Sequence, residues 1–396
     1  MDRFNSATLV AMRTMIVLGA MVLAAATAHS QWTLENSNST ASLRGIHSLG
    51  GGIAWASGTD GTVLRTEDGG FEWQTCSIPP GAEKLDFRGI QAFDANTAIV
   101  MSSGKGDLSR LYKTTDGCHS WKLVFTNPDK DGFWDAIKFM PGEKTRPFRV
   151  GTVYGDPVHG KFTRFISYDF GATWSSISEA PDAREGEAMF AASNSTLLFQ
   201  NGNELIITGG SSGSRSRTEQ YNFQHDPHVP YRFVGGDIPL AVSESAGAFS
   251  VATSLADNAN LPASKEKWIG GFYGEPIVLV TVGGDYQKPD QSSGTAAFTV
   301  DGGKTWQASK QLPHGYRSAV AYDDDAKTWI TVGPNGTDIS TDDGKNWRAV
   351  KASSALNEPA DADKNWNALS LPFVVGPHGR IGKLNEPALK AALSTK

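Results

Sequence analysis

Three arginines occupy one position of a repeated pattern, and their side chains could bind an anion. Arg44 and Arg88 each open an Arg-Gly-Ile phrase, and Arg317 opens the related phrase Arg-Ser-Ala. A guanidinium group is planar, stays charged and donates two parallel hydrogen bonds to a carboxylate or a phosphate. If the fold brings these three side chains together, they would form a binding site for a carboxylate or another anion.

The same position carries other residues in the remaining repeats, namely Asp135, Glu187, Gly247 and Asn367. In a closed ring, the three arginines and Asn367 would lie on one arc, and Asp135 and Glu187 on the next. We expect this ring to bind an anion or a peptide. The alternative is that the charges pair with one another as a structural network.

A second pattern, Tyr-Gly-acid-Pro, places Tyr154 and Asp156 in the third repeat, and Tyr273 and Glu275 in the fifth. Both copies are expected in turns between second and third strands, on the same face as the arginines. A tyrosine nucleophile beside an activating carboxylate is the arrangement of a sialidase-like glycoside hydrolase. These residues, with Glu187, are the candidate catalytic residues of such an enzyme; the other interpretation is a proline-bearing turn with a packed aromatic ring.

The candidate residues are positioned by a repeated unit whose most regular part is Ser/Thr-x-Asp-x-Gly-x-x-Trp. Asp accepts hydrogen bonds from nearby backbone amides, Gly accepts positive φ and Trp flanks the turn, so the pattern predicts a hairpin tip with a structural role. Copies lie roughly 50 residues apart, apart from one gap more than twice as long, and this spacing is typical of propellers. The Asp and Trp positions are Asp68, Trp73, Asp116, Trp121, Asp169, Trp174, Asp301, Trp306, Asp342 and Trp347.

Seven short strand openings predict seven blades, each with four antiparallel strands. In the irregular fourth unit, interpreted as repeat drift, the opening is placed at Glu187-Ala188-Met189; in the fifth, the second strand is placed at Trp268-Ile269-Gly270. The last unit has three strands, and Gln31-Trp32-Thr33-Leu34 resembles a fourth. We therefore predict an all-β, seven-bladed β-propeller of four-stranded antiparallel blades, with an N-terminal strand completing the last blade so that no open edge remains.

The first 28 residues have the features of a secretory signal peptide: Arg3 and Arg13, an apolar run from Met15 to Ala26, and small residues before a cleavage site after Ala28 or Ser30. Residues 31–385 are expected to form one propeller, and residues 386–396 a C-terminal tail. No later segment is long and apolar enough to predict a membrane span. The expected location is the periplasm or the cell exterior.

Charge and cysteine content limit the other possibilities. The net charge of -6, with basic residues scattered along the chain, gives no electrostatic surface for nucleic acid. Cys76 and Cys118, the only two cysteines, lie on units expected to be neighbours; they could pair in an oxidising compartment or remain separate thiols. We expect neither a metal site nor a cofactor. We expect the protein to be a monomer.

The hairpin pattern resembles the Asp-box, or bacterial neuraminidase repeat. Nearly the whole mature chain looks most like the bacterial photosystem II stability/assembly factor-like propellers, and more distantly like sialidases and sortilin-type propellers. The resemblance implies a noncatalytic scaffold that grips a partner polypeptide through an arginine-rich patch, to which Arg44, Arg88 and Arg317 would correspond. The Arg-Ile-Pro phrase of sialidases is absent. We therefore expect an exported binding or assembly module that recognises a polypeptide or an anionic ligand at an arginine-lined channel mouth; the alternative is a sialidase-like hydrolase acting on acidic glycans.

Overall fold

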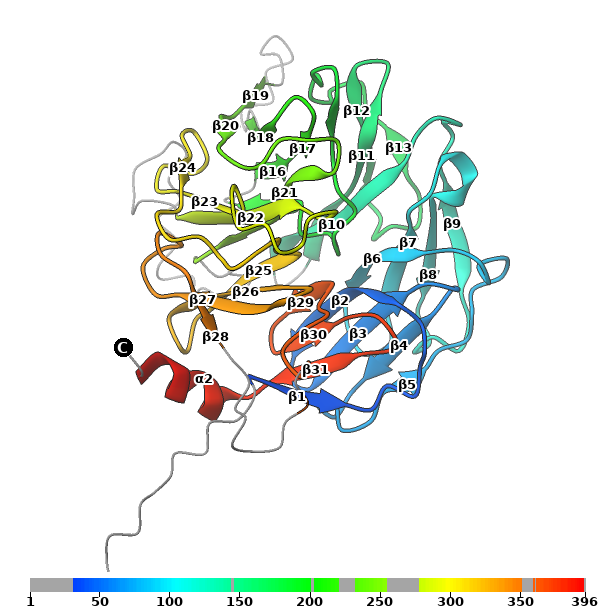
Figure 1. The fold of residues 1–396 in the computed structure, drawn as a ribbon. Helices are drawn as coiled ribbons and strands as arrows, with labels where there is room; N and C mark the ends of the chain where they lie inside the picture. Colours follow the sequence, from blue (N-terminus) through cyan, green and yellow to red (C-terminus); the bar gives the residue numbers. More distant parts are fainter. Residues whose placement is uncertain are drawn as a thin grey trace, which may run out of the picture.

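Seven antiparallel sheets stand around a common axis in the computed structural model of the protein (Figure 1). The structure describes residues 31–143, 146–200, 203–220, 232–254, 278–350, 359 and 361–394. The prediction of an all-β, seven-bladed propeller is confirmed. The innermost strand of each blade begins at one face, which we term the mouth face; the hairpins between third and fourth strands lie at the opposite face, the turn face.

The first three blades follow the chain in order. Blade one contains β2 (Leu43–Gly50), β3 (Ile53–Gly58), β4 (Val63–Thr66) and β5 (Gln74–Thr75). Blade two contains β6 (Phe87–Ala92), β7 (Ala98–Ser102), β8 (Arg110–Thr114) and β9 (Lys122–Thr126), with the short 3-10 helix η1 (Gly106–Leu108) before β8. Blade three contains β10 (Trp134–Glu143), β11 (Arg146–Val158), β12 (Lys161–Ser167) and β13 (Ser175–Ser176).

Blades four and five are less regular. Blade four contains β15 (Leu197–Gln200), β16 (Asn203–Ile207), β18 (Ser214–Gln220) and β19 (Arg232–Val234), and β20 (Asp237–Ile238) also pairs with β18. Blade five contains β21 (Ala246–Thr253), β22 (Leu279–Asp285), β23 (Ala296–Thr299) and β24 (Gln307–Ala308). Two short strands, β14 (Glu187–Ala188) and β17 (Gly209–Gly210), extend blade five beyond β21.

Two predicted strand positions are therefore wrong. The innermost strand of blade four is β15, whereas the segment around Glu187 forms β14 and pairs with β17. The second strand of blade five is β22, which pairs with β21, and the predicted strand Trp268-Ile269-Gly270 lies outside the described residues. Both errors fall where the chain departs from the regular spacing of the hairpin pattern, so the spacing alone could not locate the strands.

The last two blades close the ring. Blade six contains β25 (Ala319–Asp323), β26 (Thr328–Gly333), β27 (Gly336–Ser340) and β28 (Arg348–Val350). Blade seven contains β29 (Ala368–Ser370), β30 (Phe373–Val375), β31 (Ile381–Leu384) and β1 (Trp32–Glu35). β1 pairs antiparallel with β31, which confirms that an N-terminal strand completes the last blade (Figure 1).

The segment predicted as a C-terminal tail contains a helix, α2 (Glu386–Ser394). Leu389 is buried against the apolar core between blades six and seven. The backbone amide of Asn385 donates to the carbonyl of Gln31, and Arg348 donates to the carbonyl of Ala392 at 2.6 Å. The helix therefore covers the place where the two ends of the described chain meet.

The five repeated hairpin turns share one hydrogen-bond pattern. The first Ser or Thr donates its hydroxyl to the Asp at 2.6–2.9 Å, and it accepts from the backbone amide four residues after it at 2.8–3.2 Å. The Asp also accepts from the amide four residues after itself at 2.9–3.1 Å. The tryptophan that ends each turn is at most 9% exposed. These Asp and Trp residues thus hold turns and fill the spaces between blades.

The innermost strands present backbone amides toward the axis, where an unpaired donor would be costly. Side chains of neighbouring blades accept several of them. Ser370 Oγ accepts from Ser48, and His47 Nδ1 accepts from Ala92 at 2.9 Å. Since burial lowers the pKa of His47 to about 4, its imidazole is neutral at physiological pH and can accept this bond.

Candidate functional site

Two of the three predicted anion-binding arginines come together on the mouth face. Arg44 lies on β2 and Arg88 on β6, and their side chains are 37% and 31% exposed. Both pair with Asp86: Arg88 Nε donates to Asp86 Oδ2 at 2.8 Å, and Arg44 Nε lies 3.3 Å from Asp86 Oδ1. We refer to Arg44 and Arg88 as the arginine pair. Within the described part of the chain, their terminal Nη groups have no hydrogen-bond partner.

Arg317 does not join the arginine pair, so the prediction of a three-arginine arc is corrected. Its side chain is fully buried, and its Nη2 lies 2.6 Å from Asp338 Oδ2. Nη1 donates to Asn335 Oδ1 at 2.7 Å and to backbone carbonyls. Burial lowers the pKa of this guanidinium, and Asp338 opposes that effect. Arg317 is therefore part of an internal ion pair that a ligand does not reach.

The side-chain amide of Asn367 is hydrogen-bonded to blade one, so its Nδ2 is not free to bind a ligand. Its Nδ2 donates to the carbonyl of Leu43 at 2.8 Å, and its backbone amide donates to Val375. Because Leu43 directly precedes Arg44, this bond between blades seven and one helps to hold the start of β2 in place.

The two acids of blade three lie beside the arginine pair but are largely withdrawn from solvent. Asp135 is 1% exposed, and its Oδ2 has no hydrogen-bond partner among the described residues. Burial raises the pKa of Asp135 well above its usual range, the nearby Asp156 carboxyl adds to this, and Arg88 opposes it. Burial also raises the pKa of Asp156 to about 6, although Asp156 accepts from the amide of Met189 at 2.9 Å. Burial therefore disfavours the charged form of Asp135 beside Arg88.

Glu187 is absent from the ring position at which the sequence analysis placed it, because β14 is not the innermost strand of blade four. Its buried carboxylate is saturated with internal partners. It accepts from Arg215 Nε at 2.9 Å, from Thr208 Oγ1 at 2.7 Å and from the amide of Arg184 at 2.8 Å. Glu187 therefore joins the segments around blades four and five and is not a free acid.

The axis itself is crossed by the segment Ala191–Ser195, which we term the plug. On one side, Ser193 Oγ accepts from the amide of Ile46 in blade one at 3.0 Å. Asn194 Oδ1 accepts from the amide of Ile137 in blade three at 3.0 Å, and Nδ2 donates to the carbonyl of Ile90 in blade two at 2.9 Å. One short segment thus completes the inner edges of three blades.

The plug is also bonded to blade five. The hydroxyl of Ser195 donates to the carbonyl of Phe249 at 3.2 Å, and the backbone carbonyl of Ser195 accepts from the amide of Val251 at 2.9 Å. Ser193 and Asn194 both adopt left-handed backbone conformations, with φ of 53° and 64°, which Asn tolerates better than most residues. The plug therefore joins blade five to blades one, two and three on the inner side of the ring. Apart from the irregular fourth repeat, no sequence feature indicated the plug.

Tyr154 cannot act as a nucleophile from its position in the fold. It is fully buried and donates its hydroxyl to Glu204 Oε2 at 2.9 Å, while Arg164 lies 2.6 Å from the same oxygen. Burial raises the pKa of this phenol well above its usual range, and the charge of Glu204 adds to the effect. Arg164 also pairs with Glu219. These residues form a buried ion network between blades three and four.

The second Tyr-Gly-acid-Pro copy, with Tyr273 and Glu275, lies outside the described residues.

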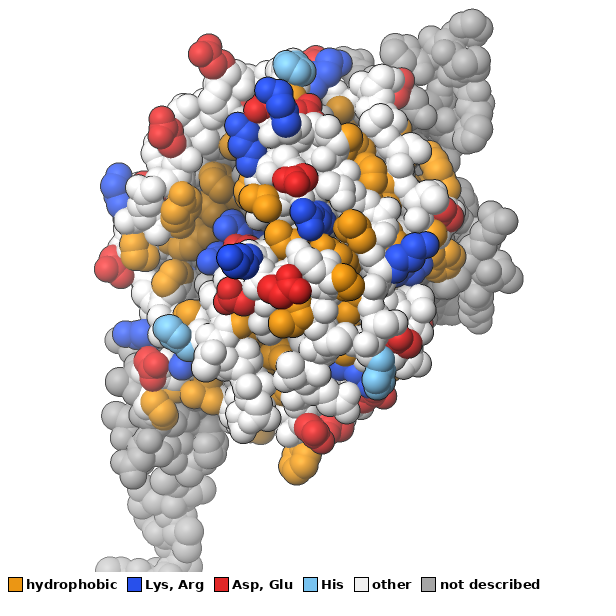
Figure 2. All heavy atoms as spheres, turned by 90° about the vertical axis from the view of Figure 1, so that its right-hand side faces the viewer, with side chains coloured by type: hydrophobic (Ala, Val, Ile, Leu, Met, Phe, Trp, Pro, Cys, Tyr) orange, Lys and Arg blue, Asp and Glu red, His pale blue; other side chains and the backbone are white. Residues whose placement is uncertain are grey.

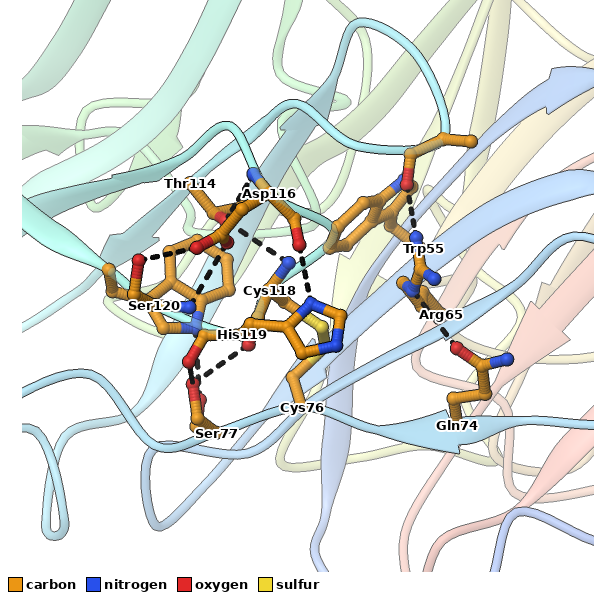
Figure 3. The surroundings of a disulfide bond; sticks show 12 residues. Trp55, Arg65, Gln74, Cys76, Ser77, Thr114, Asp116, Cys118, His119 and Ser120 are labelled. Atoms are coloured by element: carbon orange, nitrogen blue, oxygen red, sulfur yellow. Dashed lines mark hydrogen bonds between the residues drawn. A yellow bond between two sulfur atoms is a disulfide. The ribbon is translucent and has the colours of Figure 1, made fainter.

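A disulfide joins Cys76, just after β5, to Cys118 in the hairpin turn of blade two (Figure 3). Cys118 replaces the glycine of the other hairpin turns and keeps a left-handed φ of 64°. Ser77 donates its hydroxyl to the carbonyl of Cys118 at 2.8 Å (Figure 3). Trp121 Nε1 donates to the carbonyl of Ser77 at 2.9 Å. Blades one and two are thus linked covalently near the turn face.

Other surface features do not include the predicted ligand-binding residues. A cavity of 420 Å³ on blade seven is lined by residues that include Glu35, Asp361 and Arg380. Figure 2 shows the side formed by blades two and three, where coloured acidic and basic side chains are interspersed without a continuous patch of one charge. Among the described residues, no group of three His, Cys, Asp or Glu side chains could hold a metal ion, and no helix is long and apolar enough to cross a membrane.

Comparisons with known proteins identify similarities of fold. No protein-family model matches the chain, and no curated protein matches it. The fold is similar to the structure titled "YCF48 bound to D1 peptide" (TM-score 0.54, 15% identity, 90% of this chain and 95% of that one) and to "YCF48 from Cyanidioschyzon merolae" (TM-score 0.54, 16% identity, 90% and 99%). It is also similar to the structure of an ancestral GH74 enzyme (TM-score 0.50, 12% identity, 89% of this chain and 46% of that one). At these identities, the similarity concerns the propeller fold.

Proposed function

We propose that the protein is an exported, noncatalytic binding or assembly module that holds a polypeptide, or another anionic ligand, at the arginine pair. The observation that carries this proposal is the geometry of Arg44 and Arg88. Two partly exposed guanidinium groups share the single carboxylate of Asp86, so one positive charge is in excess and the terminal Nη groups are left for a ligand. Such groups bind carboxylates strongly because each hydrogen bond is charge-assisted.

The surroundings support the same proposal. Asp86 holds the two side chains by their Nε atoms, which lowers the entropy lost when a ligand is bound. Burial disfavours the ionised form of Asp135, which would otherwise compete with a ligand for Arg88. The plug is hydrogen-bonded to Ile46 of β2 and to Ile90 of β6, each two residues after an arginine of the pair. These bonds help to fix the two strands that carry the arginines.

Fold similarity adds a further reason to expect a polypeptide ligand. A similar propeller is described as YCF48 bound to D1 peptide. By analogy, we propose a photosystem II assembly factor-like role in which this propeller, with Asp-box hairpins on its turn face, receives a partner polypeptide at the mouth face. The disulfide supports an oxidising location, as proposed for the periplasm or the cell exterior.

Sialidase-like hydrolysis is not proposed, since no described pair of residues supports it. A tyrosine nucleophile must meet the substrate, whereas Tyr154 is fully buried and has a raised pKa. Asp135, the acid beside Asp156, is buried as well.

A crosslinked pull-down from the exported fraction tests the proposed function. The mature protein is compared with a folded Arg44→Ala/Arg88→Ala variant and with Lys105→Ala/Lys130→Ala, which removes two positive charges at exposed sites in blade two. We expect one set of polypeptides to be captured by the mature protein and the lysine variant and lost by the arginine variant. Equal capture by all three proteins would overturn the role of the arginine pair.

A further inference from the structure

Four aromatic rings gather on the mouth face at blades four to six. Phe190 stacks on Phe249 with ring centroids 3.9 Å apart, and Tyr316 meets Phe249 edge-on at 4.9 Å. Tyr286 contacts the same ring edge-on at 6.1 Å. We term this cluster of Phe190, Phe249, Tyr286 and Tyr316 the aromatic platform. Phe249 and Tyr316 are buried and support the cluster, Phe190 is partly exposed and Tyr286 is 48% exposed.

Tyr286 is held in place although it is exposed. It follows β22 directly, and its backbone amide donates to the carbonyl of Ser245. The preceding Asp285 accepts from Ser245 Oγ at 2.7 Å and from the amide of Gln287 at 3.0 Å. An exposed aromatic ring on a preorganised backbone is typical of an anchor that binds a partner at low entropic cost.

The plug connects the aromatic platform to the arginine pair. Phe190 directly precedes the plug, and Asn194 is bonded to Ile90, two residues beyond Arg88. The path from Phe190 to Arg88 runs along the chain to Asn194, across its hydrogen bond to Ile90 and back along β6 to Arg88. This path is at most about 30 Å long, which is the length of an extended peptide of about nine residues. One short polypeptide segment can therefore contact both features.

We propose that the aromatic platform is the second half of the ligand site and takes an apolar or aromatic side chain of the same polypeptide whose acidic group lies on the arginine pair. This inference rests on the proposed function, and it specifies the ligand as an acidic polypeptide segment with an apolar side chain within about nine residues. The arginine pair supplies charge-assisted hydrogen bonds, and the platform supplies apolar contact area that charge alone cannot provide.

Fluorescence anisotropy with labelled nonapeptide amides tests the inference. The probes have a Ser/Gly background with one Glu at a terminal position and one Phe at each other position in turn; control probes replace Glu by Gln or Phe by Ala. We expect the best Glu/Phe probe to bind at least about tenfold more tightly than its Glu/Ala control. Tyr286→Ala should remove this preference for Phe and keep the preference for Glu, whereas Phe71→Ala, at a 94% exposed position in a hairpin turn, should bind as the unaltered protein does.

The outcomes separate the inference from the proposed function. A preference for Phe that survives in Tyr286→Ala, or a preference for Glu without any preference for Phe, would overturn the inference and leave the proposed function in place. Binding that is equal for Glu and Gln probes and unchanged in Arg44→Ala/Arg88→Ala would overturn the proposed function, and with it the inference.

Discussion

Each arginine of the repeated pattern behaves according to the acids around it. Arg44 and Arg88 share Asp86 at the surface, where an ion pair contributes little to stability. Arg317 is buried and has the close partner Asp338. Arginines at the same repeat position thus differ: Arg44 and Arg88 remain partly exposed, where we propose that they bind a ligand, and Arg317 forms an internal ion pair.

Replacing Arg317 should affect stability far more than replacing Arg44. Arg317→Met leaves the buried carboxylate of Asp338 without its main partner, so we expect the free energy of unfolding to fall by about 3–5 kcal/mol. Arg44→Met, at a partly exposed site, should change it by at most about 1 kcal/mol. Urea denaturation of both variants measures the difference; equal effects would contradict the assignment of Arg317 to an internal ion pair.

Asp156 should make stability decrease as the pH rises. Because burial raises its folded-state pKa from 3.8 to about 6, its favourable contribution is complete below the unfolded pKa and is lost as the pH passes through about 6. Asp156→Asn keeps an acceptor for the amide of Met189 but does not ionise. We expect the variant to gain up to about 3 kcal/mol relative to the unaltered protein between pH 4 and pH 8. A difference between the two proteins that is independent of pH would argue against a raised pKa.

Among the structural elements, the plug is the segment that hydrogen-bonds to the innermost strands of three blades, and it lies in the irregular fourth repeat. A buried amide that loses its partner costs about 1–3 kcal/mol, and the plug satisfies such groups on three blades. It also links these blades to blade five through Ser195. The irregularity of the fourth repeat is therefore compensated by contacts that cross the ring.

Asn194 should be the most sensitive residue of the plug. Asn194→Ala leaves the amide of Ile137 and the carbonyl of Ile90 without this partner, so we expect a loss of about 2–4 kcal/mol. Ser193→Ala removes the acceptor of one amide and should cost about half as much. Chemical denaturation gives both values, and a neutral Asn194→Ala variant would contradict the bridging role of the plug.

The disulfide should stabilise the junction of blades one and two. It closes a loop of 42 residues, and removing such a link typically lowers the free energy of unfolding by about 2–4 kcal/mol. We expect Cys76→Ser/Cys118→Ser to lose this amount. In a reducing buffer, the unaltered protein should unfold at nearly the same denaturant concentration as the variant; equal stability in an oxidising buffer would show that the link is not formed.

For the whole molecule, the sequence was informative wherever its repeat was regular. The hairpin pattern, with its Asp and Trp residues, predicted the blades, and the missing strand of blade seven predicted that β1 pairs with β31. The helix α2 was missed although its sequence carries a signal: Asn385 caps it by accepting from the amide of Ala388, and leucines four residues apart lie on one face. Cap and spacing together would have identified it.

The candidate site was predictable only in part. Aligned repeats show which residues share a position, but they do not show which side chains of other strands or blades pair with them. Alignment placed Arg44, Arg88 and Arg317 in one class, yet the partner of Arg317 lies on β27, a different strand. The same applies to Tyr154, whose acid Glu204 belongs to the next blade. Pairings between blades depend on the closed ring, and the plug depends on contacts between blade five and the opposite side of the axis.

The central claim, that the arginine pair binds an anionic ligand while Arg317 does not, is tested most directly by NMR of arginine side-chain nitrogens. Nitrogen-15 spectra of the protein are assigned with the single variants Arg44→Lys, Arg88→Lys and Arg317→Lys. The spectra are then recorded during titration with the Glu-containing nonapeptides. We predict that the Glu peptide shifts the Arg44 and Arg88 signals in a saturable way and leaves the Arg317 signal unshifted. The peptide in which Gln replaces Glu should shift none of the three signals. Unchanged Arg44 and Arg88 signals at saturating peptide would contradict the account.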